Sequence, residues 1–265
     1  MGGAGLRVSG TGIRADIVTT DILVAPAKLT LSLRMVGLRA DGYHLIDAEM
    51  VALDLADELV LGHGPEVGDG SLRIEDRTGG TGCSVPGGPD DLVARALRLV
   101  DRTADVVVRK SIPAGAGLGG GSADAAAVLR WAGFDDMSAA AGIGADVAFC
   151  LVGGRARVTG TGEVVEPLPF EELVFTLLTP PVGCPTPAVY RRWDEMGGPT
   201  GDHGNDLEPA ATDLVPELIR WRDQMGDATG QRPRLAGSGS TWFVEGAYPG
   251  DGHRVVRTVP PTAPA

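Results

Sequence analysis

Apolar residues in this sequence recur with two periods, which predict where its strands and helices lie. Polar and apolar positions alternate over residues 28–33 and again over residues 48–61, which is typical of half-buried β-strands. On this pattern Lys28, Thr30 and Ser32 share one face of the first strand. Shorter apolar and β-branched runs predict three more strands, at residues 71–75, 106–108 and 173–178.

Apolar residues at helical spacing predict helices between these strands. Residues 90–100 form an amphipathic pattern that begins with aspartate, a preferred N-cap residue. Residues 214–225 show the same spacing, with Pro216 in the first turn. Residues 122–131 are rich in alanine, the strongest helix former, and residues 139–144 predict a short helix or turn.

Turn residues mark the connections and the ends of the chain. The Asp-Gly pair at residues 41–42 predicts a tight turn, followed directly by an aromatic residue and an imidazole. Residues 153–163 predict a β-hairpin that leaves the first domain, so we divide the chain into domains of residues 1–158 and 159–265. We expect residues 1–20 to be a loose extension with a short edge strand at residues 17–18, and the last residues to be frayed.

Composition narrows the possible partners. The chain has 265 residues, of which 43% are hydrophobic, and a net charge of −12, which argues against binding to nucleic acid or an anionic membrane. We expect no secretory leader and no membrane span, and therefore a cytoplasmic location. Cys83, Cys150 and Cys184 are far apart and form no Cys-x-x-Cys motif, so we expect buried thiols.

Residues 112–127 carry the strongest chemical signal. Five glycines fall within the seven positions 115–121, and an alanine-rich helix pattern follows at once. Glycine allows positive φ angles and close approach of another group to the backbone. The free N–H groups at a helix start, together with the helix dipole, attract anions. The stretch therefore predicts a phosphate-binding loop.

Three other interpretations fit this loop less well. The phosphate loop of common NTPases requires a lysine after the last glycine, whereas Ser122 and Ala123 follow Gly121 here. The dinucleotide fingerprint matches at Gly115, Gly117 and Gly120, but Pro113 interrupts the strand that should lead into it. A mobile glycine-rich surface loop is disfavoured by the strand and helix patterns on either side.

The segment from Pro113 to Ala127 resembles the central ATP-binding motif of the GHMP kinases. The resemblance implies an α+β fold with two domains, a ribosomal-protein-like N-terminal domain and a ferredoxin-like C-terminal domain. It also implies ATP as cosubstrate and Mg²⁺, held in part by Ser122. The residues implied to bind ATP are Pro113, Ala114, Gly115, Ala116, Gly117, Leu118, Gly119, Gly120, Gly121, Ser122 and Ala123.

Two further segments resemble the family's catalytic motifs. Pro-Ala-Lys-x-x-Leu at residues 26–31 is similar to the segment whose lysine lies at the acceptor hydroxyl. Gly-Ala-Asp-Val-x-Phe at residues 144–149 is similar to the segment that carries the catalytic aspartate. The resemblance therefore implies Lys28 and Asp146 as the catalytic pair. Thr30 and Asp91 stand where the family usually has asparagine.

Other segments resemble family members whose acceptor is a cytidine diphosphate-linked methylerythritol. Arg-x-Asp-Gly-Tyr-His at residues 39–44 implies that Tyr43 and His44 contact a cytosine, and residues 185–190 imply that Tyr190 stacks on it. Leu-Ala-Gly-Ser-Gly-Ser at residues 235–240 resembles the family's third glycine motif. The residues implied to bind substrate are Thr30, Tyr43, His44, Tyr190, Gly237 and Ser238.

The implied reaction is phosphorylation of the 2-hydroxyl group of that acceptor by an enzyme that is a monomer or a homodimer. Three alternatives stay open. These are a GHMP-type kinase with another alcohol acceptor, a nucleotide-binding protein of the same fold without catalysis, and a nicotinamide-dependent oxidoreductase.

Overall fold

The structure is a computed structural model that describes residues 19–64, 67, 69–79, 88 and 90–261. In these ranges the chain forms a six-stranded sheet, a four-stranded sheet and seven helices. The predicted α+β fold is confirmed. The predicted edge strand at residues 17–18, Cys83 and the last four residues lie outside the described residues.

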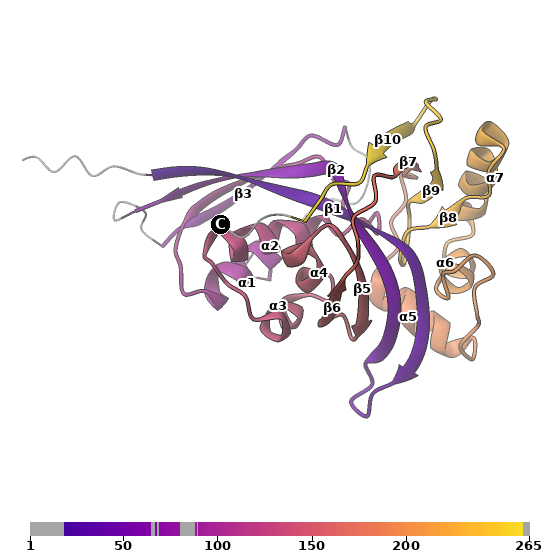
Figure 1. Cartoon of the computed structure of the whole chain (residues 1–265), viewed down its shortest axis with the longest axis horizontal. Helices are drawn as coiled ribbons and strands as arrows, with labels where there is room; N and C mark the ends of the chain where they lie inside the picture. Colours follow the sequence, from indigo (N-terminus) through magenta and orange to yellow (C-terminus); the bar gives the residue numbers. More distant parts are fainter. Residues whose placement is uncertain (1–18, 65–66, 68, 80–87, 89, 262–265) are drawn as a thin grey trace, which may run out of the picture.

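A long β-hairpin forms the backbone of the molecule (Figure 1). Its strands, β1 (Thr19–Leu38) and β2 (His44–His63), pair antiparallel over their whole length. The predicted Asp-Gly turn connects them. The other strands of the first sheet are β3 (Ser71–Asp76), β4 (Asp105–Lys110), β5 (Arg155–Gly160) and β6 (Val164–Pro167).

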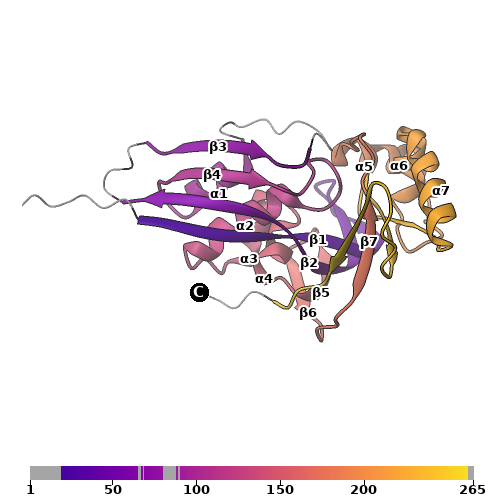
Figure 2. The same ribbon diagram turned by 90° about the horizontal axis from the view of Figure 1, so that it is seen from above.

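The sheet order is β3-β4-β2-β5-β6, with β1 on the opposite edge of β2. Only β3 and β4 run parallel. One face of the sheet is covered by helices α1 (Leu92–Leu99), α2 (Gly120–Trp131), α3 (Met137–Ile143) and α4 (Val147–Val152), as Figures 1 and 2 show. The alanine-rich α2 lies at the centre of this layer, because its small side chains allow close packing: Ala125, Ala126 and Val128 are fully buried.

The second half of the chain folds around an antiparallel sheet of order β10-β7-β9-β8. Its strands are β7 (Val174–Leu178), β8 (Arg234–Leu235), β9 (Trp242–Glu245) and β10 (His253–Arg257). The helices of this half are α5 (Thr186–Glu195), α6 (Glu208–Leu214) and α7 (Glu217–Thr229). Trp242, Phe175 and Phe243 are buried between these elements.

A short segment after β10 returns to the first sheet. Thr258 forms a bridge with Leu53, and the N–H of Val259 donates to the carbonyl of Ala52 at 3.0 Å. Pro261 bridges to Gly153. We call residues 258–261 the return strap, since they tie the second half of the chain to the first sheet.

Three predictions about elements need correction. Residues 214–225 are not one helix: Leu214 ends α6, and Pro216 caps α7, which begins at Glu217. The predicted domain division at residue 158 lies inside β5, and β6 still pairs with the first sheet. The alternation of residues 28–33 predicted a half-buried strand, and this prediction is also wrong.

The strand at residues 28–33 is not half-buried. Lys28, Leu29 and Thr30 are all buried, because the glycine loop packs against the polar face and Leu118 accepts a hydrogen bond from the N–H of Lys28 at 3.0 Å. A register shift between Thr30 and Ser32 places Ser32 opposite Glu49, whereas Thr30 is opposite Met50. Since neighbouring positions of β2 point to opposite faces, Ser32 does not share the face of Lys28 and Thr30.

Candidate active site

A pocket of about 600 Å³ lies where the two halves of the chain meet. Its walls come from the middle of β1, the glycine loop, the starts of α1, α2 and α4, helix α5 and the loop between β8 and β9. Lys28, Asp146, Ser122, Tyr190 and Ser238 all line it. Residues predicted from separate parts of the sequence therefore converge on one cavity.

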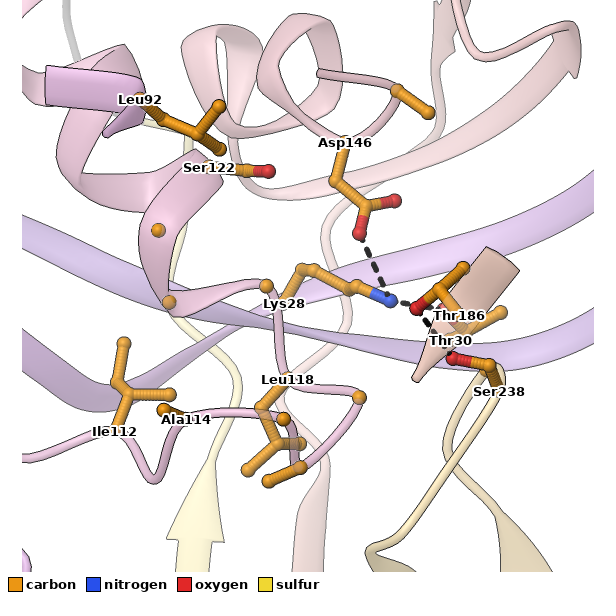
Figure 3. A pocket seen from close by; sticks show the side chains of 18 of the residues that line it. Lys28, Thr30, Leu92, Ile112, Ala114, Leu118, Ser122, Asp146, Thr186 and Ser238 are labelled. Atoms are coloured by element: carbon orange, nitrogen blue, oxygen red, sulfur yellow. Dashed lines mark hydrogen bonds and ion pairs between the residues drawn. The ribbon is translucent and has the colours of Figure 1, made fainter. Parts of the chain in front are cut away.

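Lys28 and Asp146 face each other in this pocket (Figure 3). The Lys28 Nζ lies 3.3 Å from the Asp146 Oδ2 and donates a hydrogen bond to the Thr30 Oγ1 at 3.1 Å. The Lys28 side chain is 6% exposed, whereas that of Asp146 is 29% exposed. The ammonium group is thus fixed at the bottom of the pocket, and the carboxylate is open to a bound molecule.

The local backbone structure explains where the side chains of Lys28 and Asp146 lie. Asp146 occupies the N-cap position of α4, yet its side chain makes no capping hydrogen bond, and its carboxylate points to Lys28 instead. The stem of Lys28 passes so close to Gly119 that a Cβ atom there would lie 2.7 Å from the Lys28 Cγ. A glycine at residue 119 is therefore needed to admit the lysine.

The glycine loop adopts the backbone conformation that its sequence predicts. Gly115, Gly117 and Gly119 have φ angles of 69°, 76° and 68°, which other residues rarely adopt. A Cβ atom on Gly117 would lie 2.2 Å from the carbonyl oxygen of Ala236, so the loop packs tightly against the β8–β9 loop. No side chain caps α2, which leaves the N–H groups of its first turn facing the pocket.

The pocket lining includes every residue of the loop from Pro113 to Ser122. Ser122 lies in the first turn of α2, and a Cβ atom on Gly144, two residues before Asp146, would lie 3.7 Å from its Oγ. Ala123 differs from the other predicted contacts. Its side chain is 1% exposed and lies in the hydrophobic core, and its N–H donates to the Gly119 carbonyl at 2.8 Å.

A buried charge cluster under the glycine loop was not predicted. The Lys110 Nζ donates to Asp124 at 2.6 Å and also to Asp57. The Asp57 Oδ1 accepts from the backbone N–H groups of Ser111, at 2.5 Å, and Ile112, at 2.8 Å. Asp57 therefore holds the strand end that leads into the loop.

Burial dominates the electrostatics of this cluster. Burial, assisted by the neighbouring Asp57 carboxylate and opposed by Lys110, raises the pKa of Asp124 to about 7. Burial alone would lower the pKa of Lys110, but the two carboxylates reverse this and raise it. Among the described residues, the Asp124 Oδ1 has no hydrogen-bond partner.

The β8–β9 loop, which packs against the glycine loop, forms another part of the pocket wall. The Asn205 amide donates to the carbonyls of Leu235, at 2.9 Å, and Gly237, at 2.7 Å, and so fixes the loop. The Ser238 hydroxyl lies 2.9 Å from that of Thr186. The roles of Asn205 and Thr186 were not predicted, because nothing near them in the sequence indicates which carbonyl or hydroxyl group they meet.

The three predicted base-contacting residues line the same pocket. His44 packs against Tyr190, with ring centroids 5.1 Å apart. Tyr190 is half-buried, and the loss of solvent around its phenol raises the pKa of that group. Tyr43 is 62% exposed at the rim, with the guanidinium group of Arg39 over its ring. The prediction that these rings hold a base stays a prediction.

Asp91 caps α1, as its sequence position predicts. Its carboxylate accepts from the N–H of Val93 at 2.8 Å, and the residue also lines the pocket. Cys150 and Cys184 are buried, as expected, and burial raises the pKa of the Cys150 thiol. None of the helices in the described ranges is both long and apolar enough for a membrane span.

Comparison with known proteins agrees with this geometry. Residues 91–154 match the family model described as the GHMP kinases N-terminal domain. A 4-diphosphocytidyl-2-C-methyl-D-erythritol kinase of Paracoccus denitrificans is 39% identical over 241 residues, which cover 83% of this chain and 84% of the relative. The chain belongs to the GHMP kinases.

Other relatives of this GHMP kinase carry the same name. The 4-diphosphocytidyl-2-C-methyl-D-erythritol kinase of Cereibacter sphaeroides is 36% identical over 247 residues, which cover 83% of the chain and 87% of the relative. A crystal structure titled 4-(cytidine 5'-diphospho)-2C-methyl-D-erythritol kinase superposes with a TM-score of 0.68 at 30% identity. It covers 89% of this GHMP kinase and 98% of the solved chain.

Proposed function

We propose that this GHMP kinase transfers the γ-phosphoryl group of ATP to the 2-hydroxyl group of 4-diphosphocytidyl-2-C-methyl-D-erythritol, a step of non-mevalonate isoprenoid biosynthesis. The observation that carries the proposal is the Lys28–Asp146 pair, 3.3 Å apart beside a glycine loop in one pocket. The names of relatives that match most of the chain supply the acceptor. We expect a cytoplasmic enzyme that is either a monomer or a homodimer.

In this proposal each residue has a distinct task. An alcohol is a weak nucleophile at neutral pH, so the Asp146 carboxylate accepts the hydroxyl proton as the new O–P bond forms. Lys28, fixed by Thr30, stabilises the negative charge near the acceptor oxygen. The N–H groups at the start of α2 bind the phosphates and orient the γ-phosphoryl group toward that oxygen.

The residues of the pocket would hold Mg²⁺ only together with the phosphate oxygens of a bound nucleotide. The described residues contain no group of three or more His, Cys, Asp or Glu side chains that could hold a metal. The Ser122 hydroxyl at the pocket wall is an oxygen donor of the kind that Mg²⁺ accepts, and phosphate oxygens would complete the site. When bound, the ion supplies positive charge to the phosphates.

The remaining residues would orient the acceptor rather than react with it. Tyr43, His44 and Tyr190 line the same pocket, and their flat rings suit a cytosine. Gly237 and Ser238 lie beside Lys28: a Cβ atom on Gly237 would be 3.3 Å from the Lys28 Nζ. Alignment of the hydroxyl group with Asp146 would then follow from binding of the base.

The decisive experiment is an ATP-consumption assay with 4-diphosphocytidyl-2-C-methyl-D-erythritol, in which mass spectrometry and phosphorus NMR identify the product. We expect a 2-phosphate from the wild-type protein and a kcat about 10²-fold or more lower in Asp146→Asn. Binding of ATP to that variant, measured by calorimetry, serves as the folding control. No turnover with this acceptor, but turnover with another alcohol, would favour a different GHMP-type kinase. ATP binding without turnover on any acceptor would favour a binding protein.

A further inference from the structure

Asp194, which the sequence did not indicate as a site residue, contacts the imidazole of His44, one of the proposed base-contacting residues. The His44 Nε2 lies 2.7 Å from the Asp194 Oδ1, although the two residues are 150 positions apart. His44 begins β2 at the hairpin turn, and Asp194 lies near the end of α5, beside that hairpin in Figure 1. The His44 side chain is 12% exposed, whereas that of Asp194 is 51% exposed.

Aromatic packing fixes the orientation of the same ring. Tyr190 contacts it at a centroid distance of 5.1 Å with a tilt of 54°, and Trp193 meets it edge-on at 5.5 Å. Trp193 is itself anchored, since its Nε1 donates to the Pro199 carbonyl at 2.8 Å. With the ring plane set by these neighbours, Asp194 decides which ring nitrogen carries the proton.

The chemistry of the pair determines the tautomer. A carboxylate only accepts hydrogen bonds, so the imidazole must donate from Nε2. A neutral imidazole with its proton on Nε2 has a lone pair on Nδ1, which therefore accepts a hydrogen bond. Removal of the carboxylate would free both tautomers, and Nδ1 could then donate as well as accept.

We infer that Asp194 is a positioning residue that makes His44 a hydrogen-bond acceptor toward the 4-amino group of a cytosine, and so selects cytosine over uracil. The inference rests on the proposed function, because it takes the acceptor to carry a pyrimidine nucleotide. Cytosine has an amino donor at position 4, where uracil has a carbonyl acceptor. An accepting Nδ1 is matched by the first base and faces an unpaired acceptor on the second.

Cytidine diphosphate and uridine diphosphate test this directly as ligands, since calorimetry needs no turnover. We expect the wild-type protein to bind cytidine diphosphate more tightly. In Asp194→Ala the ratio of the two dissociation constants should fall by roughly 3–10-fold, the equivalent of one hydrogen bond. The matched control is Glu195→Ala, which removes one negative charge from the next position of α5, where Glu195 pairs with Arg192. The ratio of the two dissociation constants in Glu195→Ala should equal that of the wild type.

An unchanged ratio in Asp194→Ala, or a wild-type protein that binds both nucleotides equally, would overturn the inference. Failure of the proposed function is a different result: the wild-type protein would bind the nucleotides but phosphorylate no cytidine-linked acceptor. With the full substrate we expect Asp194→Ala to raise KM with little change in kcat, because the residue acts on binding of the base.

Nitrogen NMR of histidine-labelled protein provides a readout that a purely structural role would not change. The His44 signals, assigned by their loss in His44→Gln, should show a protonated Nε2 and a bare Nδ1 in the wild type. In Asp194→Ala they should shift toward a tautomer mixture, and in Glu195→Ala they should not. A wild-type ring with a proton on Nδ1 would contradict the inference.

Discussion

At the scale of single residues, Lys28 combines two properties that rarely occur together. Its ammonium group is buried, and it contacts both a carboxylate and a hydroxyl group inside a ligand-sized pocket. A buried charge needs partners to offset its desolvation, and here Asp146 and Thr30 provide them. The same contacts direct the charge to where the proposed acceptor oxygen would lie.

Replacement of Lys28 by methionine tests this role. The variant keeps a side chain of similar length that passes Gly119, but it loses the positive charge. We expect kcat to fall by about 10²-fold, because charge stabilisation at the acceptor oxygen is lost. The KM for ATP should change little, since the glycine loop is intact. Steady-state kinetics would check this, and a kcat within twofold of the wild type would contradict a catalytic role for Lys28.

Part of the site could be predicted from the sequence, and particular residues show why the rest could not. The positive φ angles at Gly115, Gly117 and Gly119 follow from local composition alone. The meeting of Lys28 with Asp146 followed only from the resemblance, because nothing local relates a strand lysine to a helix start far along the chain.

The buried cluster of Lys110, Asp57 and Asp124 could have been predicted in part, because two of its charged residues occupy inward-facing strand positions. In the alternating pattern of residues 53–61, Asp57 lies on the same face as Leu55 and Leu59, which are buried. Lys110 likewise continues the buried face of Val106 and Val108. A charged residue at an inward position predicts a buried partner of opposite charge. The identity of that partner depends on how strands and helices pack, which alternation does not specify.

At the scale of elements, the glycine loop, which is the proposed phosphate site, also packs against a neighbouring part of the pocket wall. Gly117 lets it touch the β8–β9 loop, while Gly121 faces more open space, where a Cβ atom would meet only Leu92, at 3.6 Å. Two glycines of the same motif therefore have different tasks.

Alanine substitutions should separate these tasks. Gly117→Ala combines a positive φ with a backbone clash, so we expect a loss of about 2–5 kcal/mol in the free energy of unfolding. Gly121→Ala should fold normally but bind ATP more weakly, because its methyl group enters the pocket. Gly142→Ala, in α3 with nothing near its Cβ, is the control. Urea unfolding and ATP calorimetry measure the two effects, and equal stability of the Gly117 and Gly142 variants would contradict this assignment.

The cluster that joins β2, β4 and α2 should make stability depend on pH. Burial raises the pKa of Asp124 from 3.8 to about 7, so between these values the folded protein keeps a proton that the unfolded chain has lost. The free energy of unfolding due to this group therefore falls as pH rises through that range.

Asp124→Asn removes the titration and keeps an oxygen for Lys110. From pH 5 to pH 8 we expect the wild type to lose stability relative to this variant, as measured by urea midpoints. Asp135→Asn makes the same change at an exposed position and should follow the wild type. Parallel pH profiles for Asp124→Asn and the wild type would show that Asp124 ionises normally.

At the scale of the whole molecule, the return strap joins the two sheets. The Thr258 hydroxyl accepts from the N–H of Leu173 at 2.9 Å and donates to the Glu171 carbonyl at 2.7 Å. The N–H of Arg257 adds a bond to Asp54 at 2.9 Å. These contacts connect the start of β7, the end of β10 and the first sheet.

Thr258→Val keeps the shape of the side chain and removes both of its hydroxyl bonds. We expect a loss of about 1–3 kcal/mol in the free energy of unfolding, because the partly buried N–H and carbonyl groups lose their partner. Thr212→Val is the matched control, since its hydroxyl bonds only to carbonyls of its own helix. Chemical denaturation compares the two, and an equal loss in both would show that the strap adds no particular stability.

The strap also has a consequence for biosynthesis. Directly before it, the N–H of Arg257 bonds to Asp54, 203 positions earlier in the chain. A ribosome makes roughly 5–20 residues per second, so the sheet that carries Lys28 waits for its last partner until nearly the whole chain has emerged. During that interval the edge next to Ala52 is open to other chains, and chaperone dependence in the cell should therefore exceed what the stability of the finished enzyme suggests.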